Sequence, residues 1–325
     1  MHQDGPAMSR RIPPLNAVRA FESAARQMSF SRAGQELRVT QGAISRQIKS
    51  LEIYLGVPLF IRLTRALELT EHGRLYLAAA REALDRIEDT TLRIIAAPGG
   101  GVLTVNVLPT FAMRWLIPRL TGFTGAHPGI EVRMITSISP VHFEREDLDV
   151  AIRVGAPPSV RGPRRGPRID LEMAADWAGV RAELLMPDVL VPVCSPALRA
   201  GPNPLRRPAD LASHVLLHTA SRPHAWPDWL RVVGLAGIDA EAGPAFGHFF
   251  MTLQAAMEGK GVALVPRVLV ESDLASGHLS VPFDIPVESA GAYYLLCRER
   301  QANLPKIRAF RDWLLAERAR PLPAA

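Results

Sequence analysis

The sequence predicts an α + α/β fold, in which a helical N-terminal part is joined through one long helix to an α/β part. The first hundred residues consist of successive segments with helical apolar periodicity. Pro98–Gly101 (PGGG) interrupts that pattern and marks the clearest domain boundary. Beyond it, short apolar strands alternate with helices, which indicates an α/β sheet with parallel strands.

Three short helices are predicted near the N-terminus. Pro13 and Pro14 open the first helix, Ser31 caps a second one that ends near residue 37, and Thr40 caps a third that runs to about Leu55. Four residues form the apolar face of the first helix: Leu15, Val18, Phe21 and Ala25.

The predicted third helix has two different faces. Its apolar stripe recurs at helical spacing and holds Ile44, Ile48, Leu51 and Leu55. The opposite face carries long polar groups at Gln41, Ser45, Arg46 and Lys49. Such a helix buries one side and offers the other to a polar partner.

A hairpin and the long helix follow. Residues 59–60 and 67–69 are the predicted strands, and the tip between them contains Arg62 and Arg65. Thr70 caps a helix over about 71–96, whose apolar seam alternates steps of three and four and includes Leu77, Leu84, Ile87 and Ile94. We expect this seam to pair with a second copy of the chain, the alternative being packing on the body domain of its own chain.

The α/β part is predicted from its alternating segments. Strands are expected at 102–108, 130–135, 150–154, 189–194, 262–265 and 293–298, and helices at 111–123, 251–258 and 305–316. The segment 155–168 (GAPPSVRGPRRGPR) has the composition of a loop, either a surface insertion or a basic flap that meets an anion.

Basic charge is concentrated in the N-terminal module. The whole chain carries 38 Lys and Arg against 32 Asp and Glu, for a net charge of +6. Residues 8–66 alone hold ten basic and three acidic side chains, so the rest is close to neutral. A basic module on a neutral body indicates a polyanionic partner for that module.

The polar face of the third helix fits double-stranded DNA. In a helix-turn-helix the second helix lies in the major groove, where Gln, Arg and Lys can reach base edges and phosphates. Arg62 and Arg65 suit the flanking backbone or minor groove. The residues expected to contact DNA are Ser31, Arg32, Thr40, Gln41, Gly42, Ser45, Arg46, Lys49, Arg62 and Arg65.

The run from residue 15 to residue 73 resembles the DNA-binding domain of LysR-type transcriptional regulators. The resemblance rests on Ala24-Ala25-Arg26, on residues 29–33 (SFSRA), 39–48 (VTQGAISRQI) and 55–60 (LGVPLF), and on Leu69-Thr70. Gly34 is a departure, because the family usually has alanine there. Residues 147–155 (DLDVAIRVG), 192–196 (PVCSP) and 259–264 (GKGVAL) resemble the branch with the glycine-cleavage activator and the β-lactamase regulator.

The resemblance implies a domain plan. A winged helix-turn-helix at 8–69 and a linker or dimerisation helix at 70–97 precede a periplasmic-binding-protein-like effector domain at 102–316. Its two α/β lobes are expected at 102–184 with 283–316, and at 185–282, and the chain crosses between them near 184–190 and 281–285. The resemblance also implies a homodimer or homotetramer, contact with RNA polymerase and a small-molecule effector in the cleft.

Effector contacts are expected where strands end and helices begin, because backbone N–H groups there favour anions. Thr110 and Phe111 stand at the first such junction, and relatives place a Thr-Phe pair facing the cleft. The further candidates are Ser137, Ser139, Arg153, Phe246, His248 and Phe249. For Arg153 a structural role is the alternative, as relatives use this arginine structurally.

Other functions are disfavoured. The sequence contains no P-loop, G-x-G-x-x-G, H-E-x-x-H or G-x-S-x-G motif and no metal-ligand spacing, so we expect no enzyme and no cofactor. Cys194 and Cys297 read as small buried hydrophobes, although one branch of the family senses peroxide through a cysteine pair. With no secretory signal and no apolar membrane span, a cytoplasmic location is expected. The alternative function is a cytosolic solute or redox sensor whose N-terminal domain serves oligomerisation only.

Overall fold

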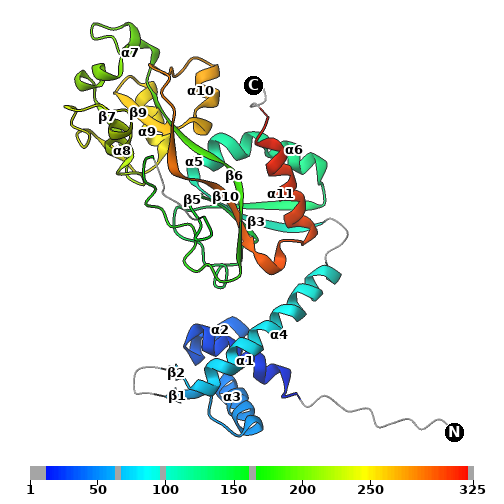
Figure 1. The fold of residues 1–325 in the computed structure, drawn as a ribbon. Helices are drawn as coiled ribbons and strands as arrows, with labels where there is room; N and C mark the ends of the chain where they lie inside the picture. Colours follow the sequence, from blue (N-terminus) through cyan, green and yellow to red (C-terminus); the bar gives the residue numbers. More distant parts are fainter. Residues whose placement is uncertain (1–11, 63–66, 96–99, 161–165, 321–325) are drawn as a thin grey trace, which may run out of the picture. The chain divides into compact units, whose positions relative to one another are not determined.

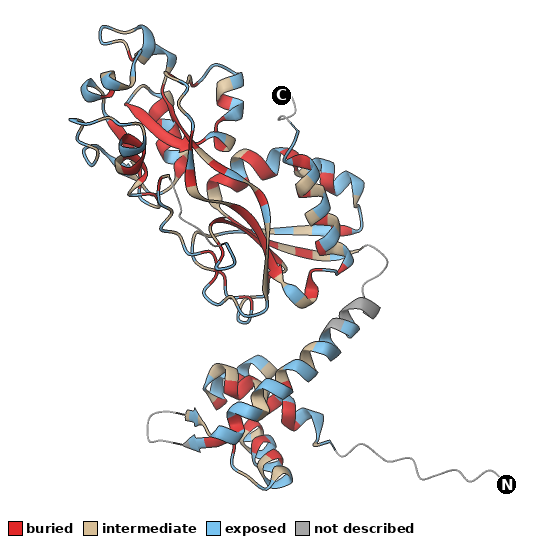
Figure 2. Cartoon of the chain, viewed as in Figure 1, coloured by how far each residue is buried: buried red, intermediate tan, exposed pale blue. Residues whose placement is uncertain are grey.

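The structure, a computed structural model, describes residues 12–62, 67–95, 100–160 and 166–320. It separates into two compact units, Met1–Ile95 and Ala96–Ala325, each with its own core (Figures 1 and 2).

The first unit is a three-helix core followed by a small hairpin and a long helix. Its elements are α1 (Leu15–Gln27), α2 (Phe30–Leu37), α3 (Gln41–Leu55), β1 (Phe60–Arg62), β2 (Leu67–Leu69) and α4 (Glu71–Ile95). Phe21, Ile44, Ile48 and Leu51 are fully buried at its centre, as the apolar periodicity predicts. Leu15 is 55% exposed and therefore does not belong to the buried face of α1.

The helix caps follow the sequence with one correction. Thr40 caps α3 as predicted, since its hydroxyl accepts a hydrogen bond of 3.2 Å from the N–H of Ala43. The cap of α2 is Ser29 rather than Ser31, because Ser29 Oγ accepts from the N–H of Arg32 at 3.3 Å. Ser31 lies inside the helix and keeps its hydroxyl on the surface.

Two side chains fix the hairpin against the helices. Glu52 on α3 accepts hydrogen bonds from the N–H groups of Leu59 and Phe60 at 2.8 and 3.3 Å. Thr70 donates to the carbonyl of Pro58 and accepts from the N–H of Gly73, which starts α4. The β1–β2 hairpin is thereby held at the end of α3, the helix whose outer face is polar.

Part of the apolar seam of the long helix α4 packs within its own unit. Leu77 and Leu84 are half-buried and pack against the core around α1, beside the buried Ala80. Ile87 is 53% exposed, and the side chain of Ile94 lies outside what the structure describes. The first half of the seam therefore packs within its own unit, and pairing of the seam with a second copy stays a prediction.

The second unit is built on one eight-stranded sheet. Its strands are β3 (Gly101–Val107), β4 (Ile130–Thr136), β5 (Val150–Gly155), β6 (Val180–Val193), β7 (Leu216–Thr219), β8 (Ala245–Phe246), β9 (Val262–Pro266) and β10 (Val287–Arg298). The helices are α5 (Pro109–Phe111), a π-helical turn (Ala112–Leu116), α6 (Ile117–Ala126), α7 (Pro196–Ala200), α8 (Ala225–Val232), α9 (Phe249–Met257), α10 (Glu271–Ala275) and α11 (Pro305–Glu317). Short 3₁₀ turns lie at Pro208–Ser213, Arg267–Leu269 and Glu299–Gln301.

The sheet is mixed rather than parallel throughout. Its strand order is β4-β3-β5-β10-β6-β9-β7-β8. The pairs β3–β4, β3–β5, β7–β8 and β7–β9 are parallel, whereas β10 runs antiparallel to β5 and β6, and β6 runs antiparallel to β9. Strand periodicity predicts the strands but not the direction in which a distant segment returns.

Two long strands join the halves of the sheet. The N-terminal part of β6 pairs along Ala292–Arg298 of β10, and Leu190–Val193 pairs with β9 in the other half. The register of β10 shifts between Glu288 and Ala292, and Phe283 and Ile285 pack in the core of the second half. The return crossing therefore lies later than residues 281–285.

Both faces of the sheet are covered, and period-two alternation decides which side chain joins which core. Tyr293, Leu295 and Cys297 of β10 face a core shared with α6, α9 and α11, while Tyr294 and Leu296 face the opposite side. In Figure 1, α6 and α11 lie side by side over the first half of the sheet. No helix in the described ranges is long and apolar enough to cross a membrane.

Candidate functional sites

The outer face of α3 presents the polar groups expected to contact a partner. Gln41, Arg46 and Lys49 are exposed, as are Thr40 and Gly42 at the start of the helix. Ser45 is half-buried and already engaged in an interaction. The buried stripe on the other side of α3 fixes which way these groups point.

The turn between α2 and α3 is tight. Arg38 adopts the left-handed conformation with φ of 54°, and its N–H donates to the carbonyl of Gln35. The N–H of Val39 donates to the carbonyl of Gly34 at 2.8 Å. A Cβ at Gly34 would lie 2.8 Å from the carbonyl oxygen of Val39, so the absence of a side chain allows this close approach.

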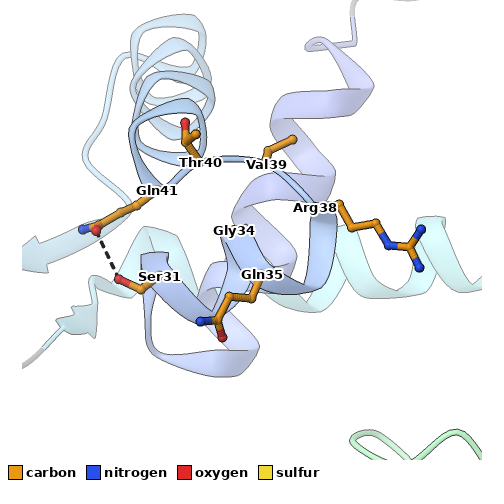
Figure 3. Close-up of a pocket in the computed structure, with 7 residues that line it drawn as sticks. All are labelled: Ser31, Gly34, Gln35, Arg38, Val39, Thr40 and Gln41. Atoms are coloured by element: carbon orange, nitrogen blue, oxygen red, sulfur yellow. Dashed lines mark hydrogen bonds between the residues drawn. The ribbon is translucent and has the colours of Figure 1, made fainter.

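The start of α3 and the outer side of α2 form a shallow hollow (Figure 3). Across it, Ser31 Oγ donates to Gln41 Oε1 at 3.1 Å, which orients the amide at the start of the exposed polar face of α3. The lining residues are Ser31, Gly34, Gln35, Arg38, Val39, Thr40 and Gln41. Gln35 and Arg38 join this surface although the sequence analysis did not select them, because only the geometry of the turn brings them beside Gln41.

Of the three remaining basic candidates, the structure describes only one side chain. Arg32 is exposed on α2. Arg62 ends β1, but its side chain is outside what the structure describes, and Arg65 lies in 63–66, outside the described residues.

The second unit contains a small, largely enclosed cavity of about 30 Å³. It lies between the first strand–helix junction of the sheet and the N-terminus of α9. It is lined by Leu108, Pro109, Thr110, Phe111, Ile138, Val154, Leu171, Ser221, Arg222, His248, Phe249, Leu269 and Tyr293. Four of the predicted effector contacts, Thr110, Phe111, His248 and Phe249, lie in this lining.

The two sides of the cavity are joined by a direct hydrogen bond. Thr110 follows β3 and is 5% exposed, and its Oγ1 accepts a bond of 3.2 Å from the N–H of Phe250 in the first turn of α9. Phe111 packs between Trp115 and Tyr293, with ring centroids 5.0 and 4.9 Å apart. Stacked aromatic rings thus form part of the apolar wall of the cavity.

A buried ion pair borders the cavity and was missed by the sequence analysis. Arg222 follows the carboxyl end of β7, is 2% exposed, and donates to Asp188 Oδ2 at 2.9 Å. Ser289 Oγ donates to the same Oδ2 at 2.6 Å, so the pair involves both crossing strands, β6 and β10. No sequence motif marks Arg222, because only the sheet topology brings residues 188, 222 and 289 together.

The other four predicted contacts are not part of the lining. Arg153 alternates with Val154 along β5 and so lies on the opposite face of the sheet, where it donates to Asn106 Oδ1 at 2.9 Å and to the carbonyl of Ser139. Burial lowers its pKa to about 10. Ser137 Oγ accepts from the N–H of Ser139, and Phe246 is half-buried in β8.

Both cysteines lie in the interior of the second unit. Cys194 and Cys297 are buried, and burial raises the pKa of both thiols, that of Cys297 to about 11. Within the part of the chain that the structure describes, no three His, Cys, Asp or Glu side chains gather as a metal site.

Comparison with known proteins decides the family. The description "Bacterial regulatory helix-turn-helix protein, lysR family" matches residues 15–74, and "LysR substrate binding domain" matches residues 96–319. The chain belongs to the LysR family. This LysR-family chain is a DNA-binding transcription regulator that responds to a small-molecule effector.

Its relatives include the branch that the sequence resembles. The glycine cleavage system transcriptional activator of Escherichia coli strain K12 is 45% identical over 312 residues, which cover 96% of each protein. The HTH-type transcriptional activator AmpR of Pseudomonas aeruginosa is 39% identical over 309 residues, which cover 95% of this chain and 97% of that protein. These LysR-family relatives are regulators of transcription rather than enzymes.

A solved structure supports the fold of the second unit. The X-ray structure of the effector domain of AmpR from Pseudomonas aeruginosa is 33% identical, with a TM-score of 0.55 over 67% of this chain and 96% of that one. The mixed α/β unit of this LysR-family chain is therefore an effector domain of the same fold.

Proposed function

We propose that this regulator binds a promoter as a homodimer or homotetramer, with α3 of each copy in a major groove of an interrupted palindrome. The observation that carries the proposal is the division of α3 into a buried stripe and an exposed polar face led by Gln41, Arg46 and Lys49. Such a helix offers hydrogen-bonding groups to base edges while its own core fixes the docking angle.

Each polar group has its own proposed role. Gln41, held by Ser31, can make a bidentate pair with adenine, and Arg46 can do so with guanine. Lys49, Arg32, Arg62 and Arg65 neutralise phosphates, as do Arg38 and the helix start at Thr40 and Gly42. These phosphate contacts position the protein and bring a steep dependence on salt.

The segment 8–69 is the proposed DNA-binding module, and 70–97 the proposed dimerisation helix. Leu77, Leu84, Ile87 and Ile94 remain the proposed seam between copies, with the exposed Ile87 available to a partner beyond the part that packs on α1. Two linked modules double the number of phosphate contacts, so pairing raises affinity without new chemistry.

The cavity beside Thr110 is the proposed effector site in the domain at 102–316. It lies where β6 and β10 cross between the halves of the sheet, and the Arg222–Asp188–Ser289 contacts connect it to both strands. A ligand that binds one arrangement of the halves better than another shifts the population toward that arrangement. In the proposed mechanism that shift changes the spacing of the DNA-binding modules and the contact with RNA polymerase in the cytoplasm.

The experiment that tests this function is binding of the purified full chain to the DNA upstream of its own gene. A random fragment of equal length is the comparison, and both are titrated by fluorescence anisotropy across a series of salt concentrations. We expect tighter binding to the upstream fragment and a linear fall of log affinity with log salt on both. A folded oligomer that binds neither fragment would contradict the proposal.

A further inference from the structure

We infer that the effector cavity selects a short-chain monocarboxylate, whose carboxylate is bound by Arg222. The inference rests on the proposed effector site and names the chemical class that this site recognises. It depends on the donor atoms of Arg222, on the charges around them, on the N-terminus of α9 and on the size of the cavity.

Arg222 has more hydrogen-bond donors than the folded chain uses. A guanidinium carries five N–H groups on three nitrogen atoms. Its Nη2 donates to Asp188, whereas neither Nε nor Nη1 has a partner among the described residues, although the side chain is 1% exposed. A buried charged group with unmet donors is costly, so a ligand that meets them binds favourably.

The geometry of the donors favours a carboxylate. Two oxygens of one carboxylate can accept from adjacent N–H groups of a guanidinium, and such charge-assisted pairs are short and strong. Asp188 pairs with the guanidinium from one side, and its Oδ2 is shared with Ser289. Asp188 carries one full opposite charge, so the Arg222–Asp188 pair is neutral before a ligand binds. A bound carboxylate is therefore stabilised by the unmet N–H donors of Arg222 and by the positive end of α9, and a second carboxylate would be buried without donors.

The first turn of α9 contributes on the other side. His248 precedes the helix without capping it through its side chain, and His248 and Phe249 both line the cavity. The positive end of a helix attracts an anion in this position. The Phe249 ring lies beneath the guanidinium, with its centroid 6.0 Å from Cζ, and holds Arg222 at the cavity wall.

The size and walls of the cavity limit the rest of the ligand. Its volume of about 30 Å³ accommodates on the order of two or three water-sized groups. Leu108, Phe111 and Val154 supply apolar wall beyond the polar edge. A carboxylate with a very short alkyl chain therefore needs only small side-chain shifts to enter, whereas a long chain or a dicarboxylate would require the cavity to open.

The test is calorimetric titration of the full chain with sodium propionate. Propionamide, of the same shape but uncharged, and inorganic phosphate, an anion of another geometry, are the comparison ligands. We expect saturable binding of propionate, binding of propionamide at least about 10-fold weaker, and none of phosphate. Equal binding of propionamide, binding of phosphate alone, or no binding of propionate would overturn the inference.

Variants separate this inference from the proposed site. Arg222→Met combined with Asp188→Asn removes both charges together, so no unpaired carboxylate is buried, and should weaken propionate binding at least about 10-fold. Arg119→Met, which removes another arginine of 1% side-chain exposure outside the cavity, should leave binding unchanged.

The Thr110→Val variant distinguishes failure of the proposed effector site from failure of the role of Arg222. Loss of propionate binding in Thr110→Val with retention in the Arg222 double variant would keep the effector site and overturn the role of Arg222. Retention in both variants would place the binding site elsewhere and overturn both. Thermal unfolding of each variant confirms that it is folded before titration.

Discussion

The hydroxyl of Thr110 accepts a hydrogen bond of 3.2 Å from the N–H of Phe250, although 140 residues separate the two in the chain. This bond joins the end of β3 to the first turn of α9 across the cavity. Removal of this bond is therefore a specific test of the proposed effector site.

We expect Thr110→Val to lose the effector response and to keep its affinity for DNA. Valine preserves the shape of threonine but cannot accept the N–H of Phe250 or contact a ligand oxygen. Promoter activity in a reporter strain, compared across growth media, measures the response. Thr124→Val is the control, because that exposed hydroxyl bonds only within its own helix. A normal response in Thr110→Val would place the effector elsewhere.

At two glycines of the helix-turn-helix, substitution by alanine should change the stability of the first unit in opposite directions. At Gly34 a Cβ would lie 2.8 Å from the carbonyl of Val39, so Gly34→Ala must shift the turn and lower the melting temperature. At Gly42 the nearest atom is 4.0 Å away, and alanine should stabilise α3 by up to about 1 kcal/mol through its higher helix propensity. Thermal unfolding of the two variants checks the contrast, and equal effects would count against the turn geometry.

Asp228 gives the second unit a pH-dependent contribution to stability. Burial raises the pKa of this carboxyl, but hydrogen bonds from Arg168 and Arg231 outweigh that effect and lower the pKa to about 2. A lowered pKa means that the stabilisation is present above the ordinary pKa near 4 and is lost as the pH falls toward 2.

Asp228→Asn should therefore cost about 1 kcal/mol at pH 7, a value reduced because both arginines are largely exposed. Urea unfolding at pH 7 and at pH 3 measures the difference between this variant and the natural chain. The difference in free energy of unfolding between the two proteins should be smaller at pH 3 than at pH 7. The same difference in free energy of unfolding at both pH values would mean that loss of the ion pairs of Asp228 is not the cause of the destabilisation.

The two thiols should be inert in the folded protein. Burial raises the pKa of both, so little thiolate forms at pH 8. A thiol-specific chromogenic reagent should label neither cysteine within minutes, and both after unfolding in urea. Rapid labelling of the native protein, together with a loss of DNA binding on oxidation, would instead support the redox-sensor alternative.

The helical first unit was the most predictable part of the chain. Local signals determine it: the stripe at Ile44, Ile48 and Leu51, and the cap at Thr40, depend on neighbours a few residues away. The error at Ser31 arose because two serines compete for one cap, and backbone geometry decides between them.

The cavity beside Thr110 was only partly predictable. Thr110 and His248 could be selected because each stands where a strand or loop meets a helix. Arg153 lies on the face of the sheet opposite the cavity because side chains alternate along its strand, and its role as an effector contact stays a prediction. Arg222 was missed because its partner Asp188 comes close only through the crossing strands. Long-range pairing of this kind leaves no periodic trace in a single sequence.

The central claim is that the polar face of α3 distinguishes one DNA sequence from another. The most direct test compares the affinity for the upstream fragment with that for random DNA, in the natural chain and in Arg46→Ala. Arg133→Ala, which removes an equal charge from the second unit, is the control. We predict that Arg46→Ala lowers the specific-to-random ratio by about 5- to 150-fold, the range of one bidentate base contact, and that Arg133→Ala leaves it unchanged. An unchanged ratio in Arg46→Ala would contradict the assignment of this face as the one that reads DNA.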